Sequence, residues 1–153
     1  MSTTSLAGLG PRSPTPPACQ ILALGLNHRT APVEVRERAA FAAEAQPAAL
    51  SALVREYGAS EAALLSTCNR CELYLVSGHD ALVQARRFLT AARGLPPAAL
   101  DAHYYALRNA EAAAHLFRVA CGIDSLVVGE SQILSQVRDA LNLARRAGSA
   151  GVL

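Results

Sequence analysis

The chain has 153 residues, 52 % of them hydrophobic and 17 % charged, a balance that suits one domain with a buried core and argues against disorder throughout. The net charge of +2 is too small to predict a nucleic-acid binder from electrostatics alone. All 14 basic residues are arginine, which excludes lysine chemistry such as a Schiff base.

The N-terminal half of the chain predicts a disordered tail followed by strands and helices. Residues 1–18 are rich in Ser, Thr, Pro and Gly without periodicity and predict the tail. An apolar run predicts a strand over 21–26, which ends at the polar loop 27–31 before Pro32. Helices are then expected over 33–40 and 44–57, and strands over 62–66 and 73–77.

The C-terminal half predicts more helix than strand. We expect a helix over 82–90, a loop at 95–97 and a weak strand over 104–107. Asn109 is a good N-cap for a helix over 111–120, which Gly122 interrupts. A final helix is expected over 131–147, because its apolar residues recur at helical spacing up to Gly148.

Interleaved strands and helices predict an α/β (α+β) fold, with a small antiparallel or mixed sheet packed with helices in a single domain over 19–153. No Gly-x-Gly-x-x-Gly follows a strand, so the sequence shows no start of a dinucleotide-binding fold. There is also no signal-peptide pattern and no apolar run of membrane-spanning length. We therefore expect a cytoplasmic protein whose four cysteines are reduced.

The most informative segment runs from Leu64 to Tyr74 and contains Cys68. A cysteine at the end of a buried strand can project into a cleft, where backbone N–H groups and the charge of Arg70 would favour its reactive form. Taken by position alone, a buried structural cysteine is the more common outcome.

Cys68 and Cys71 also form a Cys-x-x-Cys pair, the spacing of a thiol redox site or of half a zinc site. The chain offers no second paired motif to complete a zinc site. A redox site is the better of the two alternatives, and Cys71 is close enough in sequence to resolve a sulfenic acid on Cys68.

Two further segments carry polar groups at helix positions. His115 lies on the edge of the apolar stripe of its helix, where a histidine satisfied by a neighbour is common. Hydroxyl, carboxylate and amide groups over 122–132 surround a helix start, and helix capping accounts for them in the simplest way.

Three stretches together resemble the glutamyl-tRNA reductase family. They are GLNHRTAPV over 25–33, LSTCNR over 65–70 and HLFRVACGIDSLVVGESQILSQV over 115–137, in the family's order. The resemblance implies that the chain is the N-terminal catalytic domain of an enzyme that uses NADPH to reduce glutamyl-tRNA to glutamate-1-semialdehyde, the first step of tetrapyrrole synthesis.

The resemblance also implies roles for individual residues. Cys68 would attack the aminoacyl ester and form a thioester, and His115 would donate a proton. Arg70 would bind the side-chain carboxylate of the glutamyl group, which a guanidinium can hold bidentately. Glu130 would hold the α-amino group. The full substrate-binding set implied is Thr67, Cys68, Asn69, Arg70, Ser125, Glu130, Ser131, Gln132 and Gln136.

The sequence departs from the family pattern at positions 71, 121, 131 and 135. Two of these residues, Ser131 and Ser135, flank Gln132, so the family pattern does not fix the orientation of the helix that carries Gln132. Family members continue into an NADPH-binding domain and a dimerisation domain, and we expect both to be absent from a truncated chain. The resemblance implies a homodimer and an aminomutase partner for the full-length protein. The alternatives are a non-catalytic module that binds glutamyl-tRNA or partner proteins, and a Cys-x-x-Cys redox module.

Overall fold

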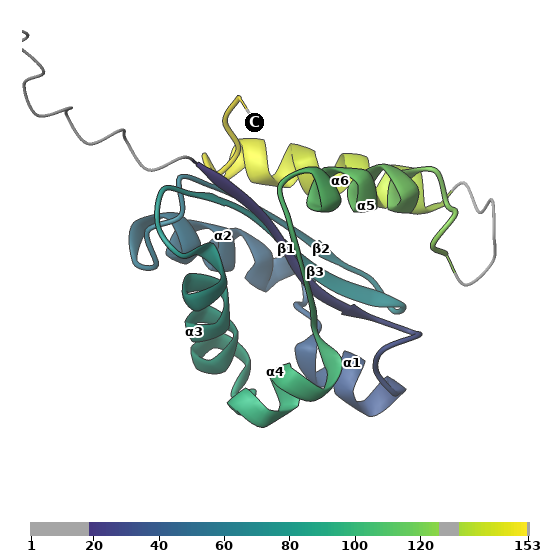
Figure 1. Ribbon diagram of the computed structural model, residues 1–153. Helices are drawn as coiled ribbons and strands as arrows, with labels where there is room; N and C mark the ends of the chain where they lie inside the picture. Colours follow the sequence, from purple (N-terminus) through teal and green to yellow (C-terminus); the bar gives the residue numbers. More distant parts are fainter. Residues whose placement is uncertain (1–18, 126–131, 153) are drawn as a thin grey trace, which may run out of the picture.

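The computed structural model describes residues 19–125 and 132–152 (Figure 1). The tail predicted over 1–18 lies outside these residues. Within them the chain forms a four-stranded sheet with helices on both faces.

The sheet is antiparallel throughout and has the strand order β2-β3-β1-β4. The α+β form of the predicted fold class, with an antiparallel sheet, is therefore confirmed. The central pair runs side by side over eight positions, from Gln20 opposite Ser77 to Asn27 opposite Arg70. The strands are β1 (Gln20–Asn27), β2 (Glu61–Ser66), β3 (Arg70–Ser77) and β4 (Tyr105–Arg108).

Six α-helices and one 3-10 helix lie in the described part of the chain. They are α1 (Val33–Ala39), η1 (Ala43–Ala45), α2 (Gln46–Arg55), α3 (Ala81–Arg93), α4 (Pro97–His103), α5 (Ala110–Ala120) and α6 (Gln132–Arg146). Asp80 caps α3 by accepting hydrogen bonds from two backbone N–H groups of its first turn. Gly94 ends α3 in the left-handed conformation, which glycine adopts without strain.

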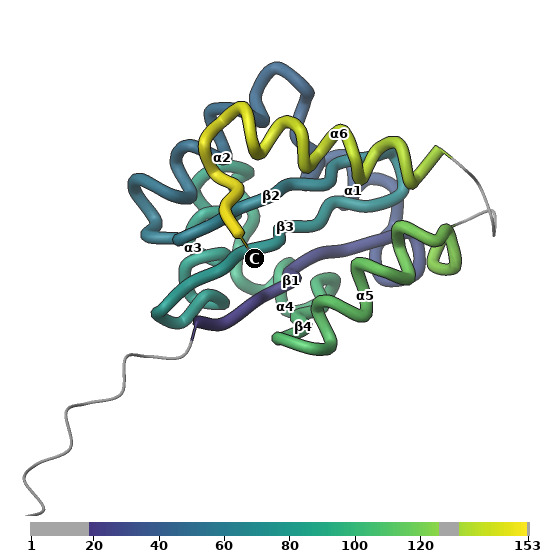
Figure 2. Tube along the Cα trace, turned by 90° about the horizontal axis from the view of Figure 1, so that it is seen from above, coloured from purple at the N-terminus to yellow at the C-terminus, as the bar shows by residue number. Residues whose placement is uncertain are grey.

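The sheet separates two helical layers, α1 to α4 on one face and α5 with α6 on the other (Figures 1 and 2). Because side chains alternate along a strand, each strand supplies both faces. Leu73 and Leu75 of β3 join the larger core with Leu22 and Leu24 of β1. On the other face Leu65, Val119 and Ile133 form a smaller cluster, so polar groups also find room there.

The structure differs from the sequence prediction in several elements. The helix predicted over 44–57 is divided into η1 and α2, and the helix predicted over 82–90 continues to Arg93. The segment taken as a loop at 95–97 leads directly into α4, with Pro97 in its first turn, a position where the missing N–H costs nothing. Strand β3 begins at Arg70, three residues before the predicted start. Asn109 precedes α5 as predicted, but its side chain accepts a hydrogen bond from the Ile21 N–H instead of capping the helix.

The segment after α6 returns to the outer edge of the sheet. The Ala62 N–H donates to the Ser149 carbonyl over 2.7 Å, and the Ser149 hydroxyl donates back to the Ala62 carbonyl over 2.8 Å. The backbone N–H groups of Gly151 and Val152 donate to the carboxylate of Glu61. This return fixes the end of α6 against β2.

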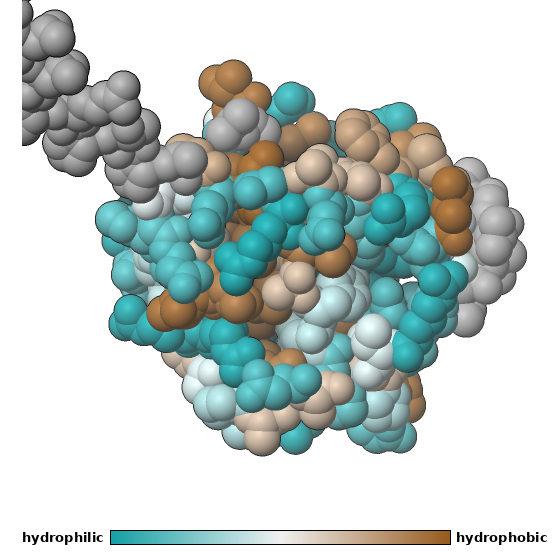
Figure 3. Space-filling view, in the orientation of Figure 1, coloured by the Kyte–Doolittle hydropathy of each residue, from teal (hydrophilic) through white to brown (hydrophobic). Residues whose placement is uncertain are grey.

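Hydrophilic and apolar residues are intermixed on the molecular face shown in Figure 3. Some large apolar side chains are strongly exposed, among them Phe117 at 72 % and Ile123 at 55 %. Within the described residues no helix has both the length and the apolar character needed to cross a membrane.

Candidate active site

Cys68 lies at the tip of the hairpin that joins β2 to β3. The Thr67 N–H donates to the Arg70 carbonyl over 2.8 Å, which closes the turn. The hydroxyl oxygen of Thr67 accepts from the backbone N–H groups of Asn69 and Arg70, each over 3.2 Å. Thr67 therefore fixes the backbone around Cys68, whose side chain is exposed.

The loop after β1 supports the same turn from the side. The His28 N–H donates to the Asn69 carbonyl over 2.9 Å. Arg36 of α1 donates from Nε to the Cys68 carbonyl over 3.2 Å and from Nη1 to the Ala31 carbonyl over 2.9 Å. Burial and the charges of neighbouring arginines lower the pKa of His28, so the base of the turn has a positive environment.

A small pocket opens beside Cys68 between the hairpin tip and the start of α6. Its lining contains seven of the predicted site residues and Ile133. Glu130 and Ser131, which belong to the same prediction, lie outside the described residues. The seven are Thr67, Cys68, Asn69, Arg70, Ser125, Gln132 and Gln136.

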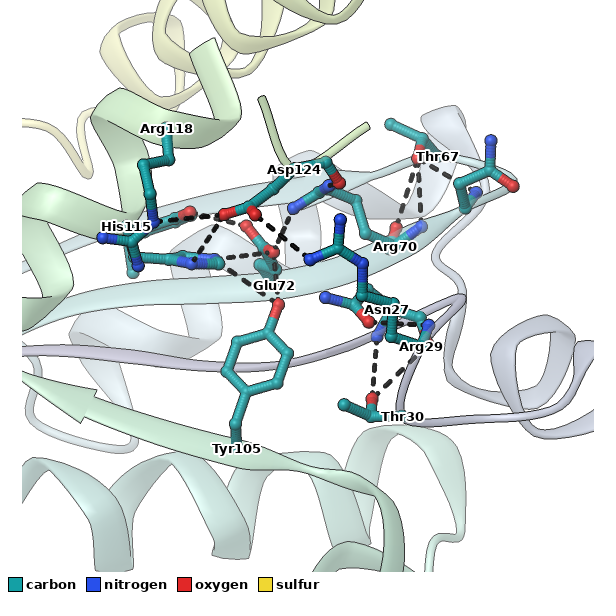
Figure 4. Close-up of polar contacts among 12 residues, drawn as sticks. Asn27, Arg29, Thr30, Thr67, Arg70, Glu72, Tyr105, His115, Arg118 and Asp124 are labelled. Carbon is teal, nitrogen blue, oxygen red and sulfur yellow. Dashed lines mark hydrogen bonds and ion pairs between the residues drawn. The ribbon is translucent and has the colours of Figure 1, made fainter. Parts of the chain in front are cut away.

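Arg70 is almost completely buried, with 2 % of its surface exposed. Its Nη1 donates to Oε1 of Glu72 over 2.8 Å, and its Nη2 donates to the Asp124 carbonyl over 2.6 Å (Figure 4). Arg70 and Glu72 share one face of β3 because they are two residues apart. These two contacts fix the orientation of the guanidinium of Arg70, a residue that lines the pocket.

Glu72 is fully buried and receives hydrogen bonds from four side chains, three of which, Arg70, Tyr105 and His115, are labelled in Figure 4. Oε1 accepts from Arg70 and from the Tyr105 hydroxyl, and Nε2 of His115 lies 3.0 Å from the same oxygen. Oε2 accepts from the Tyr74 hydroxyl over 2.5 Å. We call these five residues the Glu72 cluster.

The Glu72 cluster keeps its carboxylate ionised. Burial alone would raise the pKa of Glu72, but the hydrogen bond with His115, the charge of Arg70 and the two tyrosine hydroxyls together lower it to about 2. Burial and the negative charge of Glu72 raise the pKa of both Tyr74 and Tyr105, so both tyrosines remain neutral hydrogen-bond donors.

His115 belongs to this cluster and is not among the residues that line the pocket. Its side chain is buried, with Nε2 facing Glu72 and Nδ1 3.8 Å from Oδ2 of Asp124. Asp124 also approaches Arg29 at 3.4 Å and Arg118 at 3.3 Å. The structure connects His115 to the pocket through Glu72 and Arg70.

Gly25 makes room for the Glu72 side chain. Gly25 lies opposite Glu72 in the pairing of β1 with β3. A Cβ atom at this position would lie 2.6 Å from Cγ of Glu72 and 3.0 Å from the Cys71 carbonyl oxygen. Only a residue without a side chain fits here while Glu72 keeps its position.

Comparison with known proteins shows that the sequence of this chain is similar to one family. A family model described as glutamyl-tRNA(Glu) reductase, N-terminal domain, matches residues 24–153. The chain belongs to this family. Two curated glutamyl-tRNA reductases, from Marinobacter nauticus and Neisseria meningitidis, are 49 % and 47 % identical over 86 % of this chain.

The glutamyl-tRNA reductase fold is also found in a solved relative. The glutamyl-tRNA reductase from Methanopyrus kandleri matches with a TM-score of 0.70 and 32 % identity over 86 % of this chain, which covers 29 % of that chain. The chain spans about 30 % of the length of the curated relatives. The similarity therefore concerns the N-terminal domain of the reductase family.

The position of Cys71 argues against the Cys-x-x-Cys alternative. Its side chain points to the opposite face of β3 from Glu72 and lies in the larger core. The thiol donates to the Ala39 carbonyl over 3.3 Å, and burial raises its pKa to about 12. The suggestion that Cys71 resolves an oxidised Cys68 is thus not supported in this reductase domain. Among residues 19–125 and 132–152, no group of three or more His, Cys, Asp or Glu could hold a metal ion.

Sequence reasoning missed most of the Glu72 cluster. A signal for Glu72 was present, because a lone acidic residue interrupts the apolar run of β3 two positions after Arg70. Tyr105 and Asp124 reach the cluster from β4 and from the turn after α5. Their approach depends on the packing of the reductase domain, which sequence spacing does not reveal.

Proposed function

We propose that this chain is the substrate-binding, nucleophilic domain of a glutamyl-tRNA reductase. The observation that supports this proposal most strongly is the pocket, which is lined by Cys68, Arg70 and five polar residues implied by the family motifs. An exposed thiol at a rigid hairpin tip, beside a buried guanidinium, suits attack on an acyl group that carries a carboxylate.

In the proposed reaction the sulfur of Cys68 attacks the ester carbonyl carbon of glutamyl-tRNA. A carbon–sulfur bond forms, the bond from the carbonyl carbon to the ribose oxygen breaks, and the tRNA leaves with a proton on that oxygen. Arg70 would hold the glutamyl side-chain carboxylate during this exchange. The side-chain amides of Asn69, Gln132 and Gln136 would form hydrogen bonds with the remaining polar atoms of the glutamyl group.

The second half-reaction would need NADPH to supply a hydride to the thioester carbonyl carbon, where the carbon–sulfur bond breaks, the aldehyde forms and Cys68 leaves as a thiolate. The family resemblance assigns NADPH binding to another domain, and no residue of this chain is proposed to hold it. Glutamate-1-semialdehyde would enter tetrapyrrole synthesis in the cytoplasm. The homodimer and the aminomutase partner are proposed for the full-length reductase on the same resemblance.

His115 would act from within the Glu72 cluster. Its contact with Glu72, 3.0 Å from Nε2 to Oε1, and its burial support a role in organising Arg70. The role of His115 as a proton donor to the substrate, implied by the family, would require a path from the cluster into the pocket.

The proposal is tested by incubating the chain with glutamyl-tRNA labelled in its glutamyl group. We expect labelled glutamate on Cys68, recovered on the cysteine peptide by mass spectrometry and released by hydroxylamine, as for a thioester. Cys68→Ala should abolish the label, and Cys121→Ala, which removes another exposed thiol, should not. Equal labelling of the wild type and Cys68→Ala would refute the assignment.

A further inference from the structure

The Glu72 cluster lies behind the proposed pocket, and Arg70 is its one member among the residues that line that pocket. Glu72 has 0 % exposure and His115 has 5 %. A buried carboxylate that receives four hydrogen bonds is costly to desolvate, and replacing it with apolar packing is often neutral or favourable for stability. Its presence beside the pocket suggests a requirement beyond stability.

That requirement is a fixed orientation of the Arg70 side chain. A guanidinium has five N–H donors in a fixed plane. Two acceptors, Oε1 of Glu72 and the Asp124 carbonyl, hold Nη1 and Nη2 of Arg70 at 2.8 and 2.6 Å. With two points fixed, the plane of the guanidinium is set, and Arg70 is one of the residues that line the pocket.

The negative charge of Glu72 does not prevent an anion from binding in the pocket. The carboxylate of Glu72 is hydrogen-bonded by four side chains, those of Arg70, His115, Tyr105 and Tyr74. It contacts Arg70 from the buried side. A substrate carboxylate would approach from the side of the pocket. The arrangement therefore fixes the direction from which a second carboxylate can bind to Arg70.

We propose that Glu72 is the positioning residue that makes this domain select a glutamyl over a glutaminyl group, by fixing Arg70 and joining it to His115. Tyr105 supports Glu72 through the same oxygen, and Gly25 provides the space that Glu72 occupies. This inference rests on the proposed function and deepens it, because it names the basis of side-chain selection at the same site.

The experiment compares one tRNA charged either with glutamate or with glutamine. The rate of acyl transfer to Cys68 is measured with each under single-turnover conditions, and the ratio of the two rates is the readout. In Glu72→Gln, Arg70 loses its charged partner and its fixed plane, so the ratio should fall by about tenfold or more. A residue that only stabilised the fold would lower both rates and leave the ratio unchanged.

A second variant and a control keep the test independent of folding. Tyr105→Phe removes one hydroxyl from Oε1 of Glu72 without changing any charge, and the ratio should also fall in this variant. Asp101→Asn breaks an exposed carboxylate–arginine pair with Arg86, 2.7 Å apart and outside the pocket, and should keep the wild-type ratio. Should Glu72→Gln fail to fold by circular dichroism, Tyr105→Phe decides.

The possible results separate the two proposals. Acyl transfer in the wild type with an unchanged or increased ratio in the folded variants would overturn the role of Glu72 and leave the proposed function standing. Absence of any acyl adduct on wild-type Cys68 would overturn the proposed function, and the inference with it.

Discussion

The carboxyl group of Glu72 couples the stability of the domain to pH. Its pKa is about 2 in the folded protein, against an ordinary value of 4.5. The unfolded chain therefore binds a proton more readily, and the stabilisation is complete above pH 4.5 and lost as the pH falls towards 2. The total amounts to about 3 kcal/mol, at roughly 1.4 kcal/mol for each pH unit of the shift.

Acid unfolding of two proteins checks this coupling. The free energy of unfolding of the wild type should fall steeply between pH 4.5 and 2. Glu72→Gln should be less stable at neutral pH by about 3–5 kcal/mol, because Arg70 loses its buried partner, and its pH dependence over that range should be shallower. Parallel profiles of the two proteins would contradict the low pKa of Glu72.

Gly25 is expected to tolerate no side chain. The added Cβ of Gly25→Ala would lie 2.6 Å from Cγ of Glu72, so Glu72 must move, at a cost of about 1–3 kcal/mol. We expect lower stability by chemical denaturation together with a lower glutamyl-to-glutaminyl ratio. Gly94→Ala is the matched control, since it strains a positive φ of 61° at the end of α3 and should lower stability alone.

The two cysteines of the Cys-x-x-Cys pair should behave independently. Cys71 is buried in the core and Cys68 is exposed, so iodoacetamide should modify Cys68 in the folded protein and reach Cys71 only after unfolding. Peptide mass spectrometry measures both. Cys71→Thr should keep the peroxide sensitivity of the wild type, and a clear loss of sensitivity would restore the redox alternative.

At the scale of single elements, the cap of α3 is a local determinant of stability. Oδ1 of Asp80 accepts from the N–H groups of Leu82 and Val83 at 3.1 and 3.3 Å. Asp80→Ala should cost about 1 kcal/mol of folding free energy, measured by urea denaturation. The alkylation rate of Cys68 should not change, because α3 packs on the face of the sheet opposite to the Glu72 cluster.

Elements with a clear local pattern were predictable from the sequence. The strand at 21–26 and the helix at 111–120 each follow apolar periodicity, and both are present within one residue of the expected bounds. Helix α4 was missed because Pro96 and Pro97 suggested a loop, although proline is compatible with a first helical turn. Local patterns do not distinguish these two uses of proline.

The candidate site was predictable only in part, and for a related reason. Cys68 and Arg70 were found because they lie two residues apart in one motif, and the structure brings them together with Ser125 and Gln136 from distant segments. The position of His115 behind Glu72 was not predictable. It depends on the angle at which α5 crosses the sheet, and that angle is set by packing against β1, β4 and α6.

At the scale of the whole molecule, the site requires both helical layers and the sheet. The hairpin tip is held by α1 through Arg36, whereas the pocket wall at Gln132 and Gln136 belongs to α6. The position of α6 depends in turn on the C-terminal return to β2. Changes far from Cys68 are therefore expected to reach the pocket through α6.

Ser149→Ala tests this connection. The buried Ser149 hydroxyl donates to the Ala62 carbonyl at 2.8 Å, and its oxygen lies 3.2 Å from the Ala144 carbonyl oxygen. Its loss should cost about 1 kcal/mol, measured by thermal unfolding, and should change the alkylation rate of Cys68 by loosening α6. The control is Ser51→Ala in α2, which should leave that rate unchanged.

The C-terminal return also bears on how the domain avoids self-association. An outer strand with free N–H and C=O groups is a template for pairing with a second chain. Ala62 on β2 has both of these groups bonded to Ser149, and at the opposite edge β4 has only four residues. Docking of residues 149–152 thus removes Ala62 from the free edge of β2, so loss of that docking should appear first as aggregation during refolding.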